Sequence, residues 1–296
     1  MESNSLDFYD PKEGMLREER EEYCRQKVVS VVKHAYENTA AARDKMDRAG
    51  VSPDDIKAVK DLEKIPITRK AELPELQRKF GPVRAFQGVA IGELRRMSLS
   101  PGPIYDIGIF DPAMVRVATK SFYAGGFRKG DIVMNTFSYH LMPGAPYLDD
   151  ALTRLGAVVV ASGTAPTEQQ VQAMHDFGVT GIVTTPDFLL TLIRRTEEIG
   201  YDFRRDFALR KAEMYAGMYP PSLRKLHEDY GIATHQTYST GEWGTYAYEC
   251  HLKNGMHIAE EVMMEVVDPA TGKQLGPGEV GELVATPLIQ SYPILR

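Results

Sequence analysis

The sequence predicts an α/β fold with mostly parallel sheets and flanking helices, followed by a small antiparallel β segment. Short apolar runs rich in β-branched residues alternate with stretches of helical periodicity between residues 112 and 234. This alternation is typical of buried parallel strands joined by crossover helices. Glycines close several of the helical stretches, as expected for helix ends. After residue 255 the apolar pattern acquires a period of two, which indicates antiparallel strands.

Composition limits the classes of function. The 296 residues are 43% hydrophobic and 26% charged, which suits one large globular domain or two small ones. A net charge of −6 without a basic run argues against a nucleic-acid partner. Cys24 and Cys250 are too few for a disulfide framework and fit a reducing cytosol. The polar N-terminus and the absence of a long apolar run predict a cytoplasmic chain with no secretory signal and no membrane partner.

The first hundred residues are expected to be mainly helical. Residues 15–48 carry an apolar stripe opposite an Arg- and Glu-rich face, which predicts a helix that ends at Gly50. The run Ser52-Pro53-Asp54-Asp55 predicts the start of another short element. Pro66 and Pro74 predict a broken, loop-like stretch.

The remaining elements follow the same periodicities. Helices are expected at residues 115–124, 145–155, 167–177, 188–199 and 221–230. Strands are expected at residues 130–135, 157–161, 180–185, 211–216 and 231–234, and a hairpin at residues 262–267 and 281–286. The loops that follow parallel strands lie at one edge of a sheet, which is where α/β proteins place ligands.

Residues 235–244 form the most informative of these loops. They are expected to lie just past the carboxyl end of a strand. Tyr238 suits stacking on a base, Ser239 and Thr240 suit phosphate oxygens, and Glu242 suits a magnesium ion. The segment alone also fits a surface turn with an exposed glutamate.

Tyr238-Ser239-Thr240-Gly241-Glu242 resembles the Tyr-Gly-x-Ser/Thr-Glu motif of acyl-adenylate-forming enzymes, particularly the phenylacetate–coenzyme A ligase family. Further stretches resemble that family in the same order, at residues 8–11, 17–20, 35–39, 62–70, 184–187, 255–258 and 266–272. The resemblance covers almost the whole chain but only the front part of the family.

The resemblance implies an aryl-acid–coenzyme A ligase, in which ATP adenylates a carboxylate and coenzyme A then displaces AMP. It implies catalytic roles for Glu242, which would hold magnesium, and for Thr240. The implied ATP and AMP contacts are Ser98, Ser100, Gly102, Ala216, Gly217, Met218, Tyr238 and Ser239. The implied contacts to a small aryl or arylalkyl carboxylic acid are Phe137, Tyr139, His140, Met142, Gly144 and Ala145. A homodimer is one expected assembly.

The sequence departs from the family pattern at two loops. Ser98-Leu99-Ser100-Pro101-Gly102-Pro103 stands where the family has a Ser/Thr/Gly-rich phosphate loop ending in Gly-Lys-Pro. Two prolines there remove N–H donors, and without the family this run is simply a turn between strands. Met218 stands where the adenine loop of the family usually has an acid.

The family comparison also predicts a domain organisation. Residues 1–256 are expected to form an N-terminal adenylate-forming-type domain, and residues 257–296 the start of a β-barrel-like subdomain. The mobile C-terminal domain that carries a catalytic lysine is expected to be absent. The resulting expectation is a truncated or impaired ligase. The alternatives are a non-catalytic homologue that binds an acyl or nucleotide ligand, and an adenylyl-transferring relative resembling coenzyme F390 synthetase.

One metal site is a separate hypothesis. Cys250, His251 and His257 are potential zinc ligands within a short stretch. The spacing is not that of a zinc finger, so a structural zinc at Cys250 and His257 is one interpretation among others. The sequence has no Gly-x-Ser-x-Gly elbow and no Walker-type loop.

Overall fold

The computed structural model describes residues 8–296 and divides the chain into two compact units. Of the described residues, the sheet unit comprises 8–11 and 114–259, and the terminal unit comprises 12–113 and 260–296. The expectation that the chain lacks a secretory signal concerns the first seven residues, which lie outside the described residues. The predicted division after residue 256 stays a prediction.

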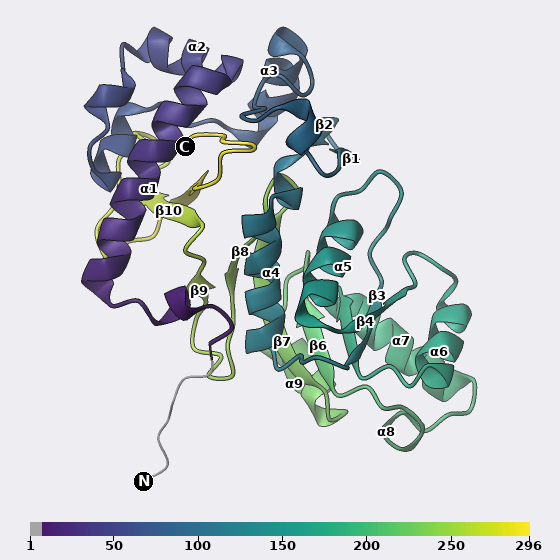
Figure 1. Ribbon diagram of the computed structural model, residues 1–296. Helices are drawn as coiled ribbons and strands as arrows, with labels where there is room; N and C mark the ends of the chain where they lie inside the picture. The colour runs from purple at the N-terminus through teal and green to yellow at the C-terminus, as the bar shows by residue number, and fades with distance from the viewer. Residues whose placement is uncertain (1–7) are drawn as a thin grey trace. The chain divides into compact units, whose positions relative to one another are not determined.

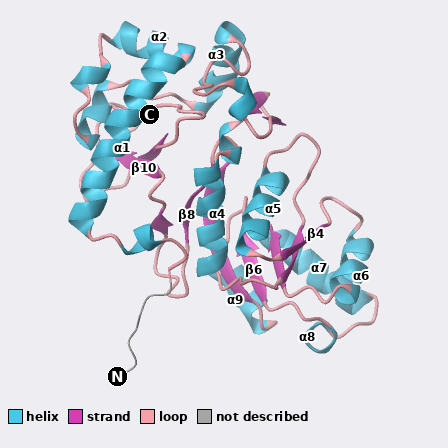
Figure 2. Ribbon diagram, in the orientation of Figure 1, coloured by secondary structure: helices cyan, strands magenta, loops and turns pink. Residues whose placement is uncertain are grey.

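A seven-stranded sheet forms the centre of the sheet unit, in the order β4-β3-β5-β6-β7-β8-β9. Figure 2 draws its strands in magenta, β4, β6 and β8 among them. The strands are β3 Ile132–Asn135, β4 Val158–Ala161, β5 Gly181–Thr184, β6 Lys211–Met214, β7 Ala233–Thr240, β8 Gly244–Tyr248 and β9 His257–Ile258. The five strands from β4 to β7 pair in parallel, whereas β8 and β9 are antiparallel additions. The predicted fold class is confirmed.

Helices cover both faces of this sheet (Figure 1). They are α4 Pro112–Ala124, α5 Gly144–Leu155, α6 Thr167–Asp176, α7 Pro186–Glu198, α8 Phe203–Asp206 and α9 Pro221–Asp229. Apolar side chains of α6 and α7 pack with sheet residues such as Ile182 and Met214 in one buried cluster. On the opposite face, Ser121 of α4 meets Tyr215. Burial of these helix faces supplies most of the driving force for the unit.

The terminal unit is mainly helical. Its helices are α1 Arg17–Asn38, α2 Ala40–Ala49 and α3 Leu73–Phe80, with short 3-10 turns at Pro11–Gly14, Pro53–Asp55, Val59–Lys64, Lys70–Glu72, Ile91–Glu93 and Gly108–Phe110. The helix predicted at residues 15–48 is interrupted at Thr39, whose backbone is extended (φ −119°, ψ 134°). The Thr39 hydroxyl and N–H both bond the carbonyl of Ala35, so this side chain ends α1 locally.

Two small antiparallel sheets complete the terminal unit. The strands β1 Ser98–Ser100 and β2 Ile104–Asp106 form one, and β10 Val262–Val267 and β11 Glu282–Pro287 form the other. The predicted C-terminal hairpin is therefore confirmed.

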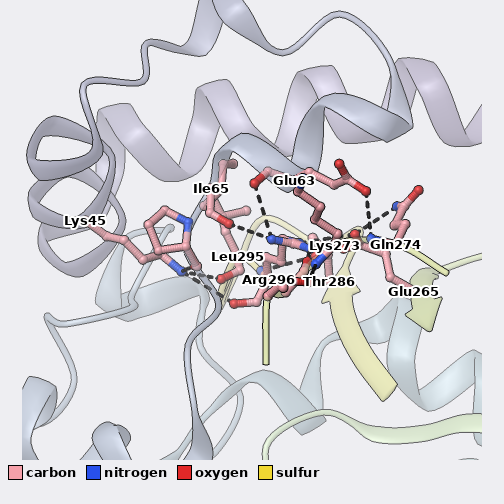
Figure 3. Close-up of polar contacts among 12 residues, drawn as sticks. Lys45, Glu63, Ile65, Glu265, Lys273, Gln274, Thr286, Leu295 and Arg296 are labelled. Atoms are coloured by element: carbon pink, nitrogen blue, oxygen red, sulfur yellow. Dashed lines mark hydrogen bonds and ion pairs between the residues drawn. The ribbon is translucent and has the colours of Figure 1, made fainter. Parts of the chain in front are cut away.

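A buried network of charged groups lies beside β10 (Figure 3). Arg296 Nε is 3.1 Å from Glu265 Oε1, and Arg296 Nη1 donates to the Ile65 carbonyl at 3.0 Å. Lys45 Nζ donates to the carbonyls of Pro66 and Leu295 at 3.0 and 2.6 Å. Burial lowers the pKa of Lys45 to about 7. Buried charges of this kind are tolerated only when they are paired or hydrogen-bonded.

Within residues 8–296, no helix combines the length and the apolar character needed to cross a bilayer.

Candidate functional site

The candidate motif lies on a β-hairpin rather than in the loop that the sequence predicts. Strand β7 continues through Tyr238, Ser239 and Thr240, and only residues 241–243 form the turn to β8. The prediction gave weight to the hydroxyl groups, whereas threonine and tyrosine also favour an extended strand. The pairing partner β8, which sequence analysis does not predict, satisfies the backbone of this part of β7.

This hairpin projects beyond the carboxyl edge of the parallel sheet. Strand β6 ends at Met214, which pairs with Gln236, so Thr237–Thr240 pair with β8 alone. The hairpin therefore lies at the edge where the loops after β3 and β6 emerge, as a ligand site in an α/β protein requires.

Tyr238 and Thr240 present different kinds of surface. The Tyr238 side chain is 42% exposed, and its ring centroid lies 5.9 Å from that of buried Tyr246. The Thr240 hydroxyl is 2.8 Å from the Tyr246 hydroxyl. Burial is the main cause that raises the pKa of Tyr246 well above its usual value, so it acts as a neutral support. The register of the β7–β8 pairing shifts between Tyr238 and Ser239, which interrupts the ladder of backbone hydrogen bonds at that point.

Glu242 occupies the tip of the hairpin and is only 4% exposed. The alternative of a surface turn with an exposed glutamate is therefore wrong. A buried carboxylate is costly unless other groups compensate its charge. Burial of a charged side chain at the edge of a sheet is a feature expected of a functional residue.

Tyr147 of α5 holds the base of the hairpin. Its hydroxyl accepts a hydrogen bond from the Thr245 N–H at 3.1 Å and donates one to the Met114 carbonyl at 3.0 Å. Gly244 has φ +82°, and a Cβ built there would lie 2.4 Å from Tyr147 Cζ. Only glycine admits the ring at this distance, so the ring and the hairpin are fitted to one another.

Tyr215 joins the hairpin to two other candidate loops. It directly precedes Ala216, its ring packs edge-on to Phe137 at 6.2 Å, and its hydroxyl is 3.3 Å from Thr245 Oγ1. Burial, followed by the charge of Glu213, raises the pKa of Tyr215. Tyr215 thus adjoins the candidate adenine loop, contacts Phe137 of the candidate aryl-acid loop and lies beside Thr245 of the hairpin.

The candidate adenine loop is open to solvent. Ala216, Gly217 and Met218 are all exposed, and Met218 is 88% exposed. Ala216 adopts a positive φ of 55°, an uncommon conformation for a residue with a side chain. Backbone strain of this kind clusters at functional sites.

The candidate aryl-acid loop is organised by Asn135, the last residue of β3. Its side-chain amide donates to the Ala145 carbonyl at 3.0 Å and to Asp149 Oδ1 at 2.8 Å. Its side-chain oxygen accepts from the Phe137 N–H at 3.1 Å. Tyr139 donates to the same Asp149 oxygen, and burial raises the pKa of Tyr139.

The other aryl-acid candidates differ in exposure. His140 is exposed, Met142 and Gly144 are half-buried, and Ala145 is fully buried near the start of α5. The structure therefore brings the start of α5 and the loop before it together with Tyr215, while His140 faces solvent.

The candidate phosphate loop belongs to the terminal unit and is the turn of the β1–β2 hairpin. The Ser98 hydroxyl donates to the Asp106 carbonyl at 3.0 Å. The Ser100 hydroxyl is buried and has no hydrogen-bond partner within residues 8–296. Gly102 lies in the turn with an extended φ of 159°. The Ser100 hydroxyl can therefore still donate a hydrogen bond to a ligand, whereas the Ser98 hydroxyl already donates one.

The described part of the chain contains no group of three or more His, Cys, Asp or Glu residues that could hold a metal ion. Cys250 is half-buried, and His257 is exposed on β9. A structural zinc normally takes four protein ligands, so these two residues do not fit a closed zinc site. Magnesium is commonly held by one or two carboxylates together with substrate phosphates, and Glu242 fits that pattern.

Sequence reasoning missed Asn135, Tyr147, Tyr215 and Tyr246. They belong to no motif, and they act through backbone atoms or hydroxyls of residues that lie six or more positions away. The signal available was Gly244, because a glycine in or beside a strand often marks a close approach of another group.

Comparison with known proteins gives a consistent result. The phenylacetate-coenzyme A ligase of Escherichia coli (strain K12) is 31% identical over 301 residues, covering 97% of this chain and 67% of that protein. The ligase of the same name from Pseudomonas putida is 31% identical over 274 residues. The match covers 90% of this chain, and the chain spans 62% of the length of that protein. No protein-family model matches.

Solved structures agree on the fold. A 2-hydroxyisobutyryl-CoA ligase in the postadenylation state, in complex with R3-HIB-AMP, superposes with a TM-score of 0.90 at 21% identity. The match covers the whole of this chain and 65% of that one. An open conformation of the ligase, in complex with 2-HIB-AMP and CoA, gives a TM-score of 0.88 at 22% identity.

Proposed function

The chain belongs to the phenylacetate–coenzyme A ligase family, and from this premise we propose that it binds an adenine nucleotide and an aryl or arylalkyl carboxylic acid. The observation that supports the proposal best is the position of Tyr215. This side chain adjoins the adenine loop at Ala216, packs on Phe137 and meets Thr245 at the base of the hairpin. Three candidate segments thus converge on one edge of the sheet.

The proposed reaction is that of an AMP-forming acid–thiol ligase. The acid carboxylate attacks the α-phosphorus of ATP, a P–O bond forms, and pyrophosphate leaves with the electron pair of the broken bond. The thiol of coenzyme A then attacks the acyl carbon of the mixed anhydride, and AMP leaves. Aryl acids are already ionised at neutral pH, so the first step needs no general base.

Each candidate side chain has a role in this proposal. Tyr238 offers a free aromatic face to adenine, and the Thr240 hydroxyl, held by Tyr246, would bond a phosphate oxygen. Glu242 would hold magnesium, which supplies charge neutralisation at the phosphates when bound. Phe137 and Tyr139 border the aryl group, and Asn135 fixes the loop that carries them.

A second candidate function is ligand binding without turnover, and the β1–β2 hairpin favours it. The hairpin contains no lysine, and the Ser98 hydroxyl is engaged within the hairpin. Positioned cations and donors normally supply several kcal/mol of stabilisation to charge developing at phosphate. We therefore expect slow or no formation of acyl adenylate by the 296-residue chain.

Two measurements test the proposal. Calorimetric titrations with AMP and with phenylacetate measure binding, and a pyrophosphate-release assay with ATP, magnesium and a panel of aryl acids measures turnover. Binding of both ligands supports the proposed site, and robust pyrophosphate release would reject the non-catalytic alternative. A chain that binds neither AMP nor any aryl acid would overturn the proposal.

A further inference from the structure

The sheet unit contains a direct link between the proposed acid site and the proposed nucleotide site. Helix α5 begins at Gly144 and Ala145, which border the acid, and carries Tyr147 one turn further along. Tyr147 is 2% exposed, and its hydroxyl bonds the Thr245 N–H at the base of the hairpin. Its position lets a displacement of the start of α5 reach the hairpin.

The contacts of Tyr147 leave the ring little freedom. Its hydroxyl is bonded on two sides, by the Thr245 N–H and by the Met114 carbonyl. The ring fills the space that a side chain at position 244 would occupy, with Cζ, the hydroxyl oxygen and Cε1 all within 2.7 Å of the built Cβ. A movement of α5 therefore moves the backbone of residues 244 and 245, because close-packed groups cannot slide freely past one another.

Residues 241–243 lie directly before this anchored backbone, and the Thr240 side chain is held from the other side by Tyr246. Both supports of the turn are hydroxyls of buried tyrosines. Glu242 lies in this turn. The two ends of the turn therefore set the position of Glu242 relative to the nucleotide phosphates.

We propose that Tyr147 is a positioning residue that couples acid binding at the start of α5 to nucleotide binding at the β7–β8 hairpin. The proposal rests on the proposed function and deepens it. The acid and the nucleotide then bind cooperatively, and occupancy of the acid site brings the hairpin into the geometry that receives the nucleotide. Coupling free energies of this kind typically change affinity by 5- to 150-fold.

The chain provides a built-in reporter. Trp243 is the only tryptophan in the sequence, and it lies in the turn between Glu242 and Gly244. Phenylacetate bound at the start of α5 should change the Trp243 emission spectrum through Tyr147, with no nucleotide present. If the Tyr147 hydroxyl had only a structural role, removing it would leave this phenylacetate-dependent change in emission in place.

The test compares Tyr147→Phe with Thr119→Val. Tyr147→Phe keeps the ring and removes both hydrogen bonds of the hydroxyl. Thr119 is a buried residue of α4 whose hydroxyl bonds the Val115 carbonyl at 2.9 Å and a carbonyl of α5, that of Ala151, at 3.2 Å, so its hydrogen bonds do not involve the hairpin. Thr119→Val therefore controls for the loss of a buried hydroxyl between the same two helices.

The dissociation constant of AMP is measured by calorimetry with and without saturating phenylacetate, and Trp243 emission is recorded in parallel. In the unaltered chain, phenylacetate should tighten AMP binding at least fivefold and shift the emission. Tyr147→Phe should reduce the factor to less than twofold and abolish the shift, whatever its effect on AMP affinity without acid. Thr119→Val should retain both effects.

Two outcomes overturn the coupling role and leave the proposed function intact. One is an unaltered chain that binds both ligands without cooperativity or emission change, a result that needs no variant to fold. The other is a Tyr147→Phe protein with full coupling. A chain that binds neither ligand would instead reject the proposed function and this inference together.

Discussion

The β7–β8 hairpin and the β1–β2 hairpin contain the same kinds of side chain but use their hydroxyl groups differently. In β7–β8, buried tyrosines supply the supporting bonds, and the Thr240 hydroxyl is held at the tip. In β1–β2, the Ser98 hydroxyl closes the hairpin itself. Within β1–β2 the Ser98 hydroxyl is therefore taken by the hairpin itself, whereas the Ser100 hydroxyl has no partner within residues 8–296 and is available to a ligand.

The largest expected effect concerns Glu213, a buried carboxyl group on β6 that is hydrogen-bonded to the neighbouring strand β7. Glu213 is fully buried and accepts a hydrogen bond from Thr237 Oγ1 at 2.7 Å. Burial is the main cause that raises its pKa from 4.5 to about 8. Because the folded chain holds this proton and the unfolded chain releases it, this contribution to stability is complete below about pH 4.5. It is lost as the pH rises toward 8.

We expect the free energy of unfolding to fall between pH 5 and 8.5, by at most about 5 kcal/mol from this group. Glu213→Gln keeps an acceptor for Thr237 and should flatten that dependence, so the variant gains stability relative to the original chain as the pH rises. Urea unfolding at four pH values measures this. An unchanged pH slope in the variant would assign the dependence to other groups.

Gly244→Ala tests the fit between the hairpin and Tyr147. The new Cβ must displace the ring, which should cost about 2 kcal/mol beyond the backbone strain. Gly126→Ala is the matched control, since Gly126 has φ +84° and open space around its Cβ. Urea denaturation compares the two variants. Equal destabilisation would mean that the Tyr147 ring yields without cost.

Tyr238→Ala tests which hairpin stacks on adenine. Base–aromatic stacking is worth about 1–3 kcal/mol, so AMP affinity should fall roughly tenfold or more. Tyr105→Ala on β2 is the control, because Tyr105 is similarly exposed, at 39% against 42% for Tyr238. Calorimetry should show normal AMP affinity in the control. The same loss in both variants would remove the distinction between the hairpins.

The smallest expected effect separates Ser100 from Ser98. Ser100→Ala should weaken ATP binding about fivefold and leave AMP binding unchanged, because its hydroxyl has no partner within residues 8–296. Ser98→Ala should instead lower stability by about 1 kcal/mol, since it removes a hydrogen bond within the hairpin. Nucleotide titration and urea unfolding of both variants check this. Weaker ATP binding in Ser98→Ala alone would reverse the assignment.

The fold could be predicted from the sequence because its signals are local. The β-branched runs at residues 157–161 and 180–185 and the glycines after the helices fix the strands and helices of the parallel sheet. The hairpin at residues 262–267 and 281–286 is confirmed for the same reason. The interruption of the first helix was missed because it depends on a Thr39 side-chain bond.

The candidate site could be predicted only in part. The motif indicated Tyr238 and Glu242, since their side chains have recognisable chemistry. It gave no sign of β8, whose bonds to β7 satisfy strand residues that were expected to lie in a loop. Tyr147 and Asn135 were missed because their partners are backbone atoms that come close only after folding.

The parallel sheet has a consequence for how this chain tolerates change. The turns from helix to strand at Gly178 and Gly231 have a positive φ, and a Cβ at each would meet no atom within 4 Å beyond its chain neighbours. These turns precede β5 and β7, so they lie at the amino edge of the sheet, across from the proposed ligand edge. Peptide insertions, fused domains or circularly permuted termini placed there have room to vary while the β7–β8 hairpin keeps its geometry.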